Sequence, residues 1–411
     1  MQQARPAKQL MTCFPSALQG VRHWWHLHGD KLLWGAVLLM LLAAIHRLGN
    51  EFSRLLYETG PAGAIDLKLR HSEVHRWFSG EPIHDPHESS PYPPASMILL
   101  WPLLGWLPVD KARWWWATTT IMALGWFVVL SLRESGADRL VERAFIALLP
   151  LSIYGTSAAI GNGQISVHLL PVLVASLVSL ATARRWYEDL CGAGLFLVTL
   201  VKPSVAVPFT WLIWLLPSRL RSLSAVLAGY ALLTWLATSF QQTGLRTLLS
   251  GWMTRAGGVL SRGAWGYGNV SNWLVGLGLP DWIPYAGFLI LMTLGGWLFH
   301  HRRADPWVLI GITAIVARLW TYHQLYDDVL ILLPMIALFR IAKLDASHRN
   351  ADVTAGSLLA LTWLGMLAPA RLLSFPVTAG LFSAGQAIIW LAVLVFFVAY
   401  ARNTDHTRVS A

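Results

Sequence analysis

The run LLWGAVLLMLLAAIHRLG at residues 32–49 is apolar over nearly the ~20 residues that a helix needs to cross a bilayer. Similar runs recur along the chain, and the longest, 191–217, is interrupted by Pro203 and Pro208. Residues 270–280 add a short apolar segment. We therefore predict an all-α integral membrane protein, a polytopic helical bundle of about 11–13 transmembrane helices. The predicted spans are 32–49, 93–109, 113–132, 140–157, 165–183, 191–217, 222–240, 283–299, 306–321, 326–342, 355–372 and 376–400.

The composition agrees with this class. Of 411 residues, 55% are hydrophobic and only 13% are charged, whereas soluble domains carry about 25% charged residues. The net charge of +10 comes from basic residues that flank the apolar runs, so we expect a lipid bilayer as partner and no nucleic acid. The two cysteines have neither metal-ligand spacing nor the pattern of a structural disulfide.

Lysine and arginine predict the orientation, because cytoplasmic loops are enriched in both. They place the tails 1–31 and 402–411 in the cytoplasm, around a transmembrane domain at 32–401. The loops 50–92 and 241–268 then lie outside. No small-residue cleavage site follows the first run, so we expect a retained anchor and not a signal peptide.

One inconsistency concerns the crossings between the external loop 50–92 and the cytoplasmic Arg133. Their number must be odd, yet 93–109 and 113–132 are two runs. Either one of these runs is re-entrant or lies in the interface, or a later loop is assigned to the wrong side.

The external loop 50–92 carries two notable features. Asp66 precedes a stretch whose apolar residues suit an amphipathic helix on the membrane surface. Its ordinary interpretations are a solvated loop acid or a helix N-cap. Tyr92, within Pro91-Tyr92-Pro93-Pro94, marks a helix start, and the prolines also suit a rigid turn that aims the tyrosine.

Polar residues also interrupt later runs. A turn explains Gly161-Asn162-Gly163, whereas Gln164 begins a span with an amide that needs a partner, and we interpret His168 as a core histidine. Lys202 lies about ten residues from either end of the run 191–217, next to Pro203. A lysine at this depth is costly, and it is a natural counter-ion for a phosphate.

The segment Arg318 to Asp328 is densely polar at a turn between two spans. A salt-bridged helix corner explains it as well as a functional site does. Arg255 and Arg262 precede Asn269-Val270-Ser271, which also fits an N-glycosylation sequon. We discount glycosylation, because nothing in the sequence indicates a eukaryotic secretory setting.

Taken in order over roughly residues 35–345, these features resemble the GT-C glycosyltransferases, specifically glycosyltransferase family 87, typified by polyprenyl-phosphate-mannose-dependent α-mannosyltransferases. The chain departs from the family where a tyrosine-rich stretch is replaced by Arg70-His71 and a common tyrosine by His84. Asn269-Val270-Ser271 stands where the family has Asn-Gln-Ser. The matching elements are Asp66, the Gly80 region, Tyr92-Pro93-Pro94, Pro102-Leu103, Gly163-Gln164, Lys202-Pro203, Asn269 with Ser271, Tyr322-His323 and Tyr326-Asp327-Asp328.

The resemblance implies a transferase that takes a hexose, with mannose as first candidate, from a polyprenyl-phosphate sugar and gives it to an extracytoplasmic glycan or lipid, with inversion. It implies a multi-pass protein of the plasma (inner) membrane, with Asp66 as base. Candidate phosphate ligands are Lys202, Arg318, His323, Arg255 and Arg262. Candidate sugar or acceptor ligands are Tyr92, Asn162, Gln164, Asn269, Tyr322, Asp327 and Asp328.

Asp327 and Asp328 could bind a divalent cation, but two adjacent acids make a poor metal signature. We therefore favour a site with no metal and no other cofactor. The main alternative function is a transporter or flippase of a lipid-linked or polar solute, which should show related halves and a site near the midplane. A structural membrane protein, an O-antigen-type ligase and a protein glycosyltransferase are further alternatives.

Overall fold

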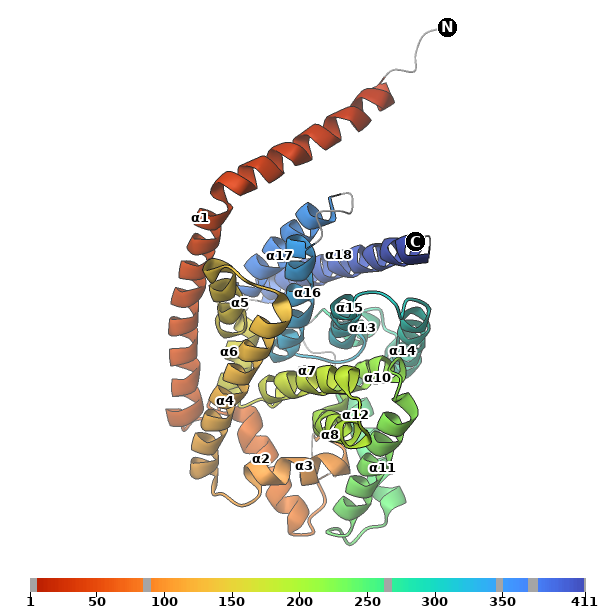
Figure 1. Ribbon diagram of the computed structural model, residues 1–411. Coiled ribbons are helices and arrows are strands. Elements are labelled where there is room, and N and C mark those ends of the chain that lie inside the picture. Colours follow the sequence, from red (N-terminus) through yellow and green to blue (C-terminus); the bar gives the residue numbers. More distant parts are fainter. Residues whose placement is uncertain (1–5, 84–89, 262–267, 345–349, 369–375, 410–411) are drawn as a thin grey trace.

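The computed structural model describes residues 6–83, 90–261, 268–344, 350–368 and 376–409. In this part of the chain every regular element is a helix, which confirms the predicted all-α class. Figure 1 shows α1 (Pro6–Tyr57) along one side of the bundle, with α2 (Ile65–Phe78) and α3 (Pro94–Leu104) at its C-terminal end. The other helices are α4 Val109–Ser135, α5 Leu140–Ser152, α6 Tyr154–Asn162, α7 Ser166–Thr182, α8 Trp186–Thr199, α9 Pro203–Ala206, α10 Thr210–Trp214, α11 Arg219–Thr238, α12 Leu245–Ser261, α13 Val270–Gly276, α14 Ile283–His300, α15 Pro306–Leu319, α16 Leu332–Leu344, α17 Ala351–Met366 and α18 Pro376–Val409, with 3₁₀ helices η1 Val207–Phe209, η2 Pro280–Trp282 and η3 Leu325–Ile331.

Within the described ranges, five helical segments are long and apolar enough to cross a membrane, or six if the bent pair α5–α6 counts as one span. Their outer faces are apolar: Leu227 on α11 is 70% exposed and Leu289 on α14 is 66% exposed. The other predicted spans correspond to shorter helices, because prolines and tight turns divide apolar runs that hydropathy counts as continuous. The five long segments are Leu27–Tyr57, Val109–Ser135, Arg219–Thr238, Pro280–His300 and Val377–Asn403.

The lengths of α3 and α4 remove the inconsistency in the predicted crossings. α3 has 11 residues and is thus ~16 Å long, about half of the ~30 Å hydrocarbon core. α4 has 27 residues and is long enough to cross. By length, a single crossing therefore separates loop 50–92 from Arg133.

Two ends of the bundle carry different polar contacts. At one end, Arg139 pairs with Asp30 at 2.6 Å, and Lys343 pairs with Glu142 at 2.5 Å. Three segments predicted to be cytoplasmic therefore meet there. Arg54 lies at the far end of α1, ~36 Å of helix from Asp30, and donates a hydrogen bond of 2.8 Å to Asn162. The candidate site lies at this second end.

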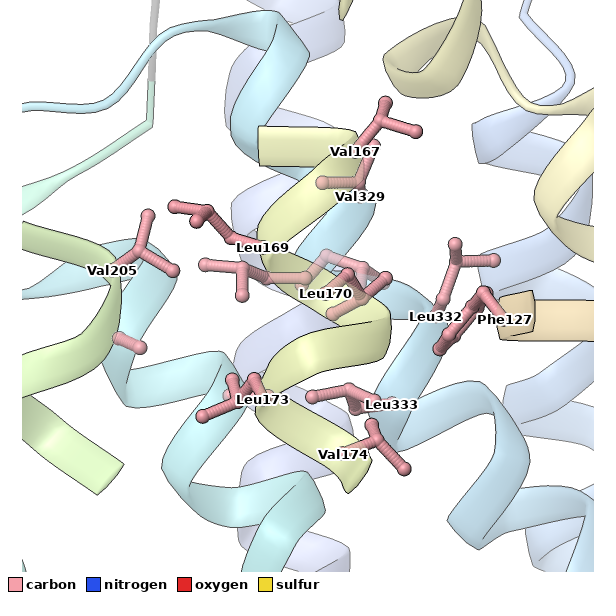
Figure 2. Packing of buried hydrophobic residues seen from close by; sticks show 14 of the residues in the cluster. Phe127, Val167, Leu169, Leu170, Leu173, Val174, Val205, Val329, Leu332 and Leu333 are labelled. Atoms are coloured by element: carbon pink, nitrogen blue, oxygen red, sulfur yellow. The ribbon is translucent and has the colours of Figure 1, made fainter. Parts of the chain in front are cut away.

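Between the two ends, α7 is packed in a dry core (Figure 2). Leu170 and Val167 face Phe127 of α4, Val329 of η3 and Leu332 of α16. A void of about 10 Å³ among these side chains is lined almost entirely by apolar atoms and is at the lower limit for one water molecule. Close packing of this kind fixes the helix ends that carry the site.

The predicted amphipathic helix is present as α2, and its apolar face packs on the protein. Leu67, Val74 and Trp77 are buried. Trp77 donates a hydrogen bond of 3.0 Å from Nε1 to the carbonyl of Ala237 at the end of α11. His71 donates one of 2.7 Å to the carbonyl of Leu107, between α3 and α4. α2 is thus held at both of these contacts.

Two glycines let α6 approach α1 and α2. A Cβ on Gly161 would lie 1.7 Å from a carboxylate oxygen of Glu51, and one on Gly163 would lie 2.4 Å from the Cβ of Leu67. Gly163 also has φ +70°, a left-handed conformation that favours glycine. The predicted turn at 161–163 is therefore also a site of close backbone contact.

We expect Gly163→Ala to lower the melting temperature of the purified protein in detergent. The left-handed backbone alone costs an alanine roughly 1–2 kcal/mol, and the contact with Leu67 adds strain. The matched control is Gly125→Ala in α4, where a Cβ meets no heavy atom within 4 Å and the melting temperature should not fall. Equal melting temperatures for the two variants would contradict the close-approach argument.

Candidate active site

Asp66 lies in the first turn of α2 and is half-buried. The N-cap of α2 is Ala64, so the N-cap interpretation of Asp66 does not hold. The backbone N–H of Ala64 donates a hydrogen bond of 3.1 Å to the carbonyl of Gly161. The Gln164 side chain donates a hydrogen bond to the Asp66 carboxyl group. The loop 161–164 therefore holds Asp66 through both its backbone and its side chain.

Burial raises the pKa of Asp66 above its ordinary value. The hydrogen bond from Gln164 and the charges of Arg70 and Lys202 oppose this shift, but burial is the larger effect. A carboxylate with a raised pKa binds a proton more readily than a free aspartate does. The environment of Asp66 therefore suits a general base.

Lys202 lies at the N-cap of α9, in the break between α8 and α9. Its ammonium group contacts Asp327 Oδ1 at 2.5 Å and donates to Ser166 Oγ at 3.3 Å. It also lies 4.8 Å from the centre of the Tyr326 ring. The lysine side chain keeps 12% of its surface exposed, so the predicted deep cation is paired but still reachable.

Asp327 collects three partners while it is almost fully buried. Ser166 donates to its Oδ1 at 2.6 Å, and His323 donates from Nδ1 to its Oδ2 at 2.9 Å. The other ring nitrogen of His323, Nε2, is buried and has no hydrogen-bond partner among the described residues. Asp327 thus orients both Lys202 and His323, and His323 Nε2 stays buried without a hydrogen-bond partner among the described residues.

Asp328 serves a separate pair. Its carboxylate accepts hydrogen bonds from Arg318 and from the hydroxyl of Tyr154. The Arg318 guanidinium is 1% exposed, lies 5.2 Å from the centre of the Trp390 ring and donates to the carbonyl of Gly268 at 3.5 Å. Arg318 is therefore fully paired with protein groups. This agrees with the salt-bridged helix corner that was one of the two interpretations of the 318–328 segment.

Tyr92 is buried beneath the guanidinium of Arg70, which lies 4.4 Å from the ring centre. Arg70 also pairs with Glu73 and donates to Ser90 Oγ at 3.3 Å. Burial raises the pKa of Tyr92, and so does the nearby charge of Asp66, whereas Arg70 opposes both. The aromatic ring thus lies within electrostatic range of the candidate base.

Asn269 caps α13, since its side chain accepts a 3.0 Å hydrogen bond from the backbone N–H of Asn272. It also donates to the carbonyl of His323 at 3.3 Å and has no exposed surface. This burial agrees with the decision to discount glycosylation. Asn269 positions His323 instead of lining open space.

The remaining candidate residues have other partners or lie on other elements. Asn162 accepts its hydrogen bond from Arg54, beside Gly161. The hydroxyl of Tyr322 accepts one from Gln324. Arg255 lies on α12, and Arg262 falls outside the described residues. No three His, Cys, Asp or Glu side chains in the described ranges are placed to hold a metal ion together, and the metal-free site remains a prediction.

Several residues that form hydrogen bonds or ion pairs with the candidate site residues were missed by the sequence analysis. Ser166 was hidden because serine is common in apolar helices, where its hydroxyl bonds to the backbone. Tyr154 was hidden because an aromatic ring is ordinary in an apolar run. Arg70 was noted only as a departure from the family pattern, and Glu73 not at all. Their i, i+3 spacing on an amphipathic helix was the available signal.

A comparison with protein-family models decides the family of the protein. The model of glycosyltransferase family 87 matches residues 91–339, more than half of the chain. The chain belongs to glycosyltransferase family 87. No curated protein and no solved structure matches it. The matched range of this family-87 member contains Tyr92, Lys202 and Asp327 but not Asp66.

We expect Lys202→Met to destabilise the protein by about 3–5 kcal/mol, because it leaves the buried Asp327 without its cation. Lys202→Met combined with Asp327→Asn should lose less than the sum of the two single variants. Unfolding in detergent measures all three, with Arg133→Met, at a side chain 74% exposed, as the control without effect. Additive losses would show that the pair is not coupled.

Proposed function

We propose that this protein transfers a hexose from a polyprenyl-phosphate sugar to an extracytoplasmic glycan or lipid acceptor, with Asp66 as general base. The observation that carries the proposal is the proximity of a half-buried aspartate and a lysine that keeps part of its surface exposed. Asp66 and Lys202 lie within electrostatic range of each other, although they come from distant parts of the chain. Gln164 and Tyr92 lie beside the same carboxylate.

The reaction needs only proton acceptance and anion stabilisation. An acceptor hydroxyl oxygen attacks the anomeric carbon as the bond from that carbon to the phosphate oxygen breaks. The hydroxyl proton passes to Asp66, and the electron pair of the broken bond leaves with the polyprenyl phosphate. A single displacement inverts the anomeric centre. The phosphate is a stabilised leaving group, so no strong general acid is required.

Lys202 is the proposed cation for the departing phosphate. Asp327 and Ser166 hold its ammonium group, so little ordering remains to be done when the donor binds. His323 is a second candidate contact for the phosphate when its ring is doubly protonated, because Nε2 then carries an N–H, and Asp327 fixes the orientation of the ring. Asp327 is a positioning residue in this scheme.

Aromatic and amide groups are available for the sugar. The Tyr92 and Tyr326 rings lie next to Arg70 and Lys202 respectively, and an aromatic face suits the apolar face of a hexose. Gln164 is a candidate for a sugar hydroxyl through the part of its amide that does not bind Asp66. Arg318, Asn269 and Asp328 act by holding the segments that carry these groups.

The polar contacts at the two ends of the helical bundle support a site on the extracytoplasmic side of the plasma membrane. The cluster lies at the end of α1 opposite the contacts of Asp30, Arg139 and Lys343, whose segments are predicted to be cytoplasmic. A polyprenyl donor would reach that end laterally from the outer leaflet.

The packing beneath the site favours a transferase over a transporter. A transporter needs a solvated route past the site, whereas the residues that follow Ser166 and Asp328 enter the dry core around α7. The void there has room for at most one water molecule and is apolar.

We expect Asp66→Asn to lower transfer by about 10²–10⁴-fold, the usual contribution of a general base. The assay follows labelled hexose from polyprenyl-phosphate hexoses in membranes that contain the protein. Asp110→Asn, an exposed acid in the first turn of α4, is the matched control and should keep full activity. Full transfer by Asp66→Asn would remove the base assignment.

The acid side of the pH profile provides a further test. A base works above its pKa, so activity falls as the pH drops through the raised pKa of Asp66. Gln164→Met removes a hydrogen bond that lowers this pKa, and the acid limb of kcat/KM should therefore move to higher pH. Gln242→Met, at an exposed glutamine after α11, should leave the limb in place. A limb that stays fixed in Gln164→Met would contradict the proposed hydrogen bond.

A further inference from the structure

α12 has the residue pattern of a helix that lies in a membrane surface. At about 100° per residue, Leu245, Leu249 and Met253 form one strip along it. Leu245 is 43% exposed, Met253 is 59% exposed and Leu249 between them is half-buried, so most of this strip is left uncovered by the rest of the described protein. The opposite side of α12 carries serine, threonine and glycine. Such a helix buries its apolar strip at the boundary between headgroups and acyl chains.

The other edge of the apolar face anchors α12 to the protein. Leu248 is buried, and Trp252 donates a hydrogen bond of 2.9 Å from Nε1 to the carbonyl of Pro91. α12 also contacts α3, α11 and α13. Leu248 and Trp252 therefore fix the orientation of α12 on the protein. The strip of Leu245, Leu249 and Met253 is exposed because of this orientation and not because the helix is loosely held.

All the charged side chains in the sequence around α12 are basic. Residues 190–280 contain no aspartate and no glutamate. Arg246, exposed on α12, borders the apolar strip three residues before Leu249, and it has no ion-pair partner among the described residues. Arg255 lies on the same helix. An arginine beside an apolar strip can place its stem in the acyl region and its guanidinium on a phosphate.

We propose that α12 is a docking helix for the anionic headgroups of the surrounding leaflet, with Leu245, Leu249 and Met253 in the lipid and Arg246 on lipid phosphates. The charge of the region selects this occupant, because a neutral surface would leave its arginines without counter-ions. The bond from Trp252 to Pro91 joins α12 to the residue before Tyr92, and hence to the proposed sugar site. This last link depends on the proposed function, whereas the docking itself does not.

The test measures the depth of α12 and not activity. Met253→Cys is made in a Cys13→Ser and Cys191→Ser background and spin-labelled, and the protein is placed in nanodiscs. Accessibility to oxygen and to a water-soluble nickel complex is then compared in pure phosphatidylcholine and with phosphatidylglycerol added. We expect the label at 253 to be protected from nickel, and more so with the anionic lipid. A label at Thr247→Cys, on the polar side of α12, should stay exposed to nickel.

Arg246→Gln separates the charge from the apolar strip. An arginine at an anionic surface shifts such an equilibrium about fivefold, so the extra protection by phosphatidylglycerol should fall by about that factor. Arg133→Gln, at another exposed arginine, should keep the full response. Nickel access to residue 253 in both lipids would overturn the docking proposal. Equal protection in both lipids, unchanged by Arg246→Gln, would overturn its anionic part. Either result leaves the transfer reaction to be judged by Asp66→Asn.

Discussion

The ion pair between Lys202 and Asp327 is the contact on which the arrangement of the site depends. A single charge within an apolar bundle costs at least about 2.5–3.5 kcal/mol, so neither residue is tolerable without the other. Asp327 then gathers Ser166 and His323 around itself. The start of α7, the break between α8 and α9, and the turn before η3 therefore meet at one carboxylate. Their convergence brings the Lys202 and Asp327 pair within electrostatic range of Asp66.

The 3₁₀ conformation of η3 explains how two neighbouring acids serve different partners. Successive residues in a 3₁₀ helix point about 120° apart, so Asp327 and Asp328 diverge although they are adjacent in sequence. Asp327 faces Lys202, while Asp328 faces Arg318 and Tyr154. Through Arg318, the second acid connects the site to the Trp390 ring on α18. One acid thus orients chemical groups and the other secures the segment that carries them.

Several residues of the candidate site could be predicted from the sequence, because charged residues in apolar runs are costly and so rarely occur without a role. Lys202 and the 318–328 segment stood out for that reason, whereas Asp66 stood out in an external loop, before an amphipathic stretch. The pairing of these residues could not be predicted, because whether Lys202 meets Asp327 depends on tertiary packing. The prolines at 203 and 208 indicated the break within 191–217. The division of the other apolar runs into short helices was missed, since hydropathy sums composition and does not register where a helix turns. Only the length of α3, which is too short to cross the membrane, showed that a single crossing separates loop 50–92 from Arg133.

The contact between Arg70 and Tyr92 has a consequence for how the protein diversifies. Arg70 is balanced by its own acid, Glu73, on the same helix, and shares no direct partner with Lys202 or Asp327. The Tyr92 ring is therefore held by a different ion pair from the one that lies beside the Tyr326 ring. In the proposed site, a substitution at Tyr92 would change the surface that meets the sugar without removing a partner of Lys202 or Asp327. Sugar preference would then be free to change while the contacts that orient Lys202 stay the same.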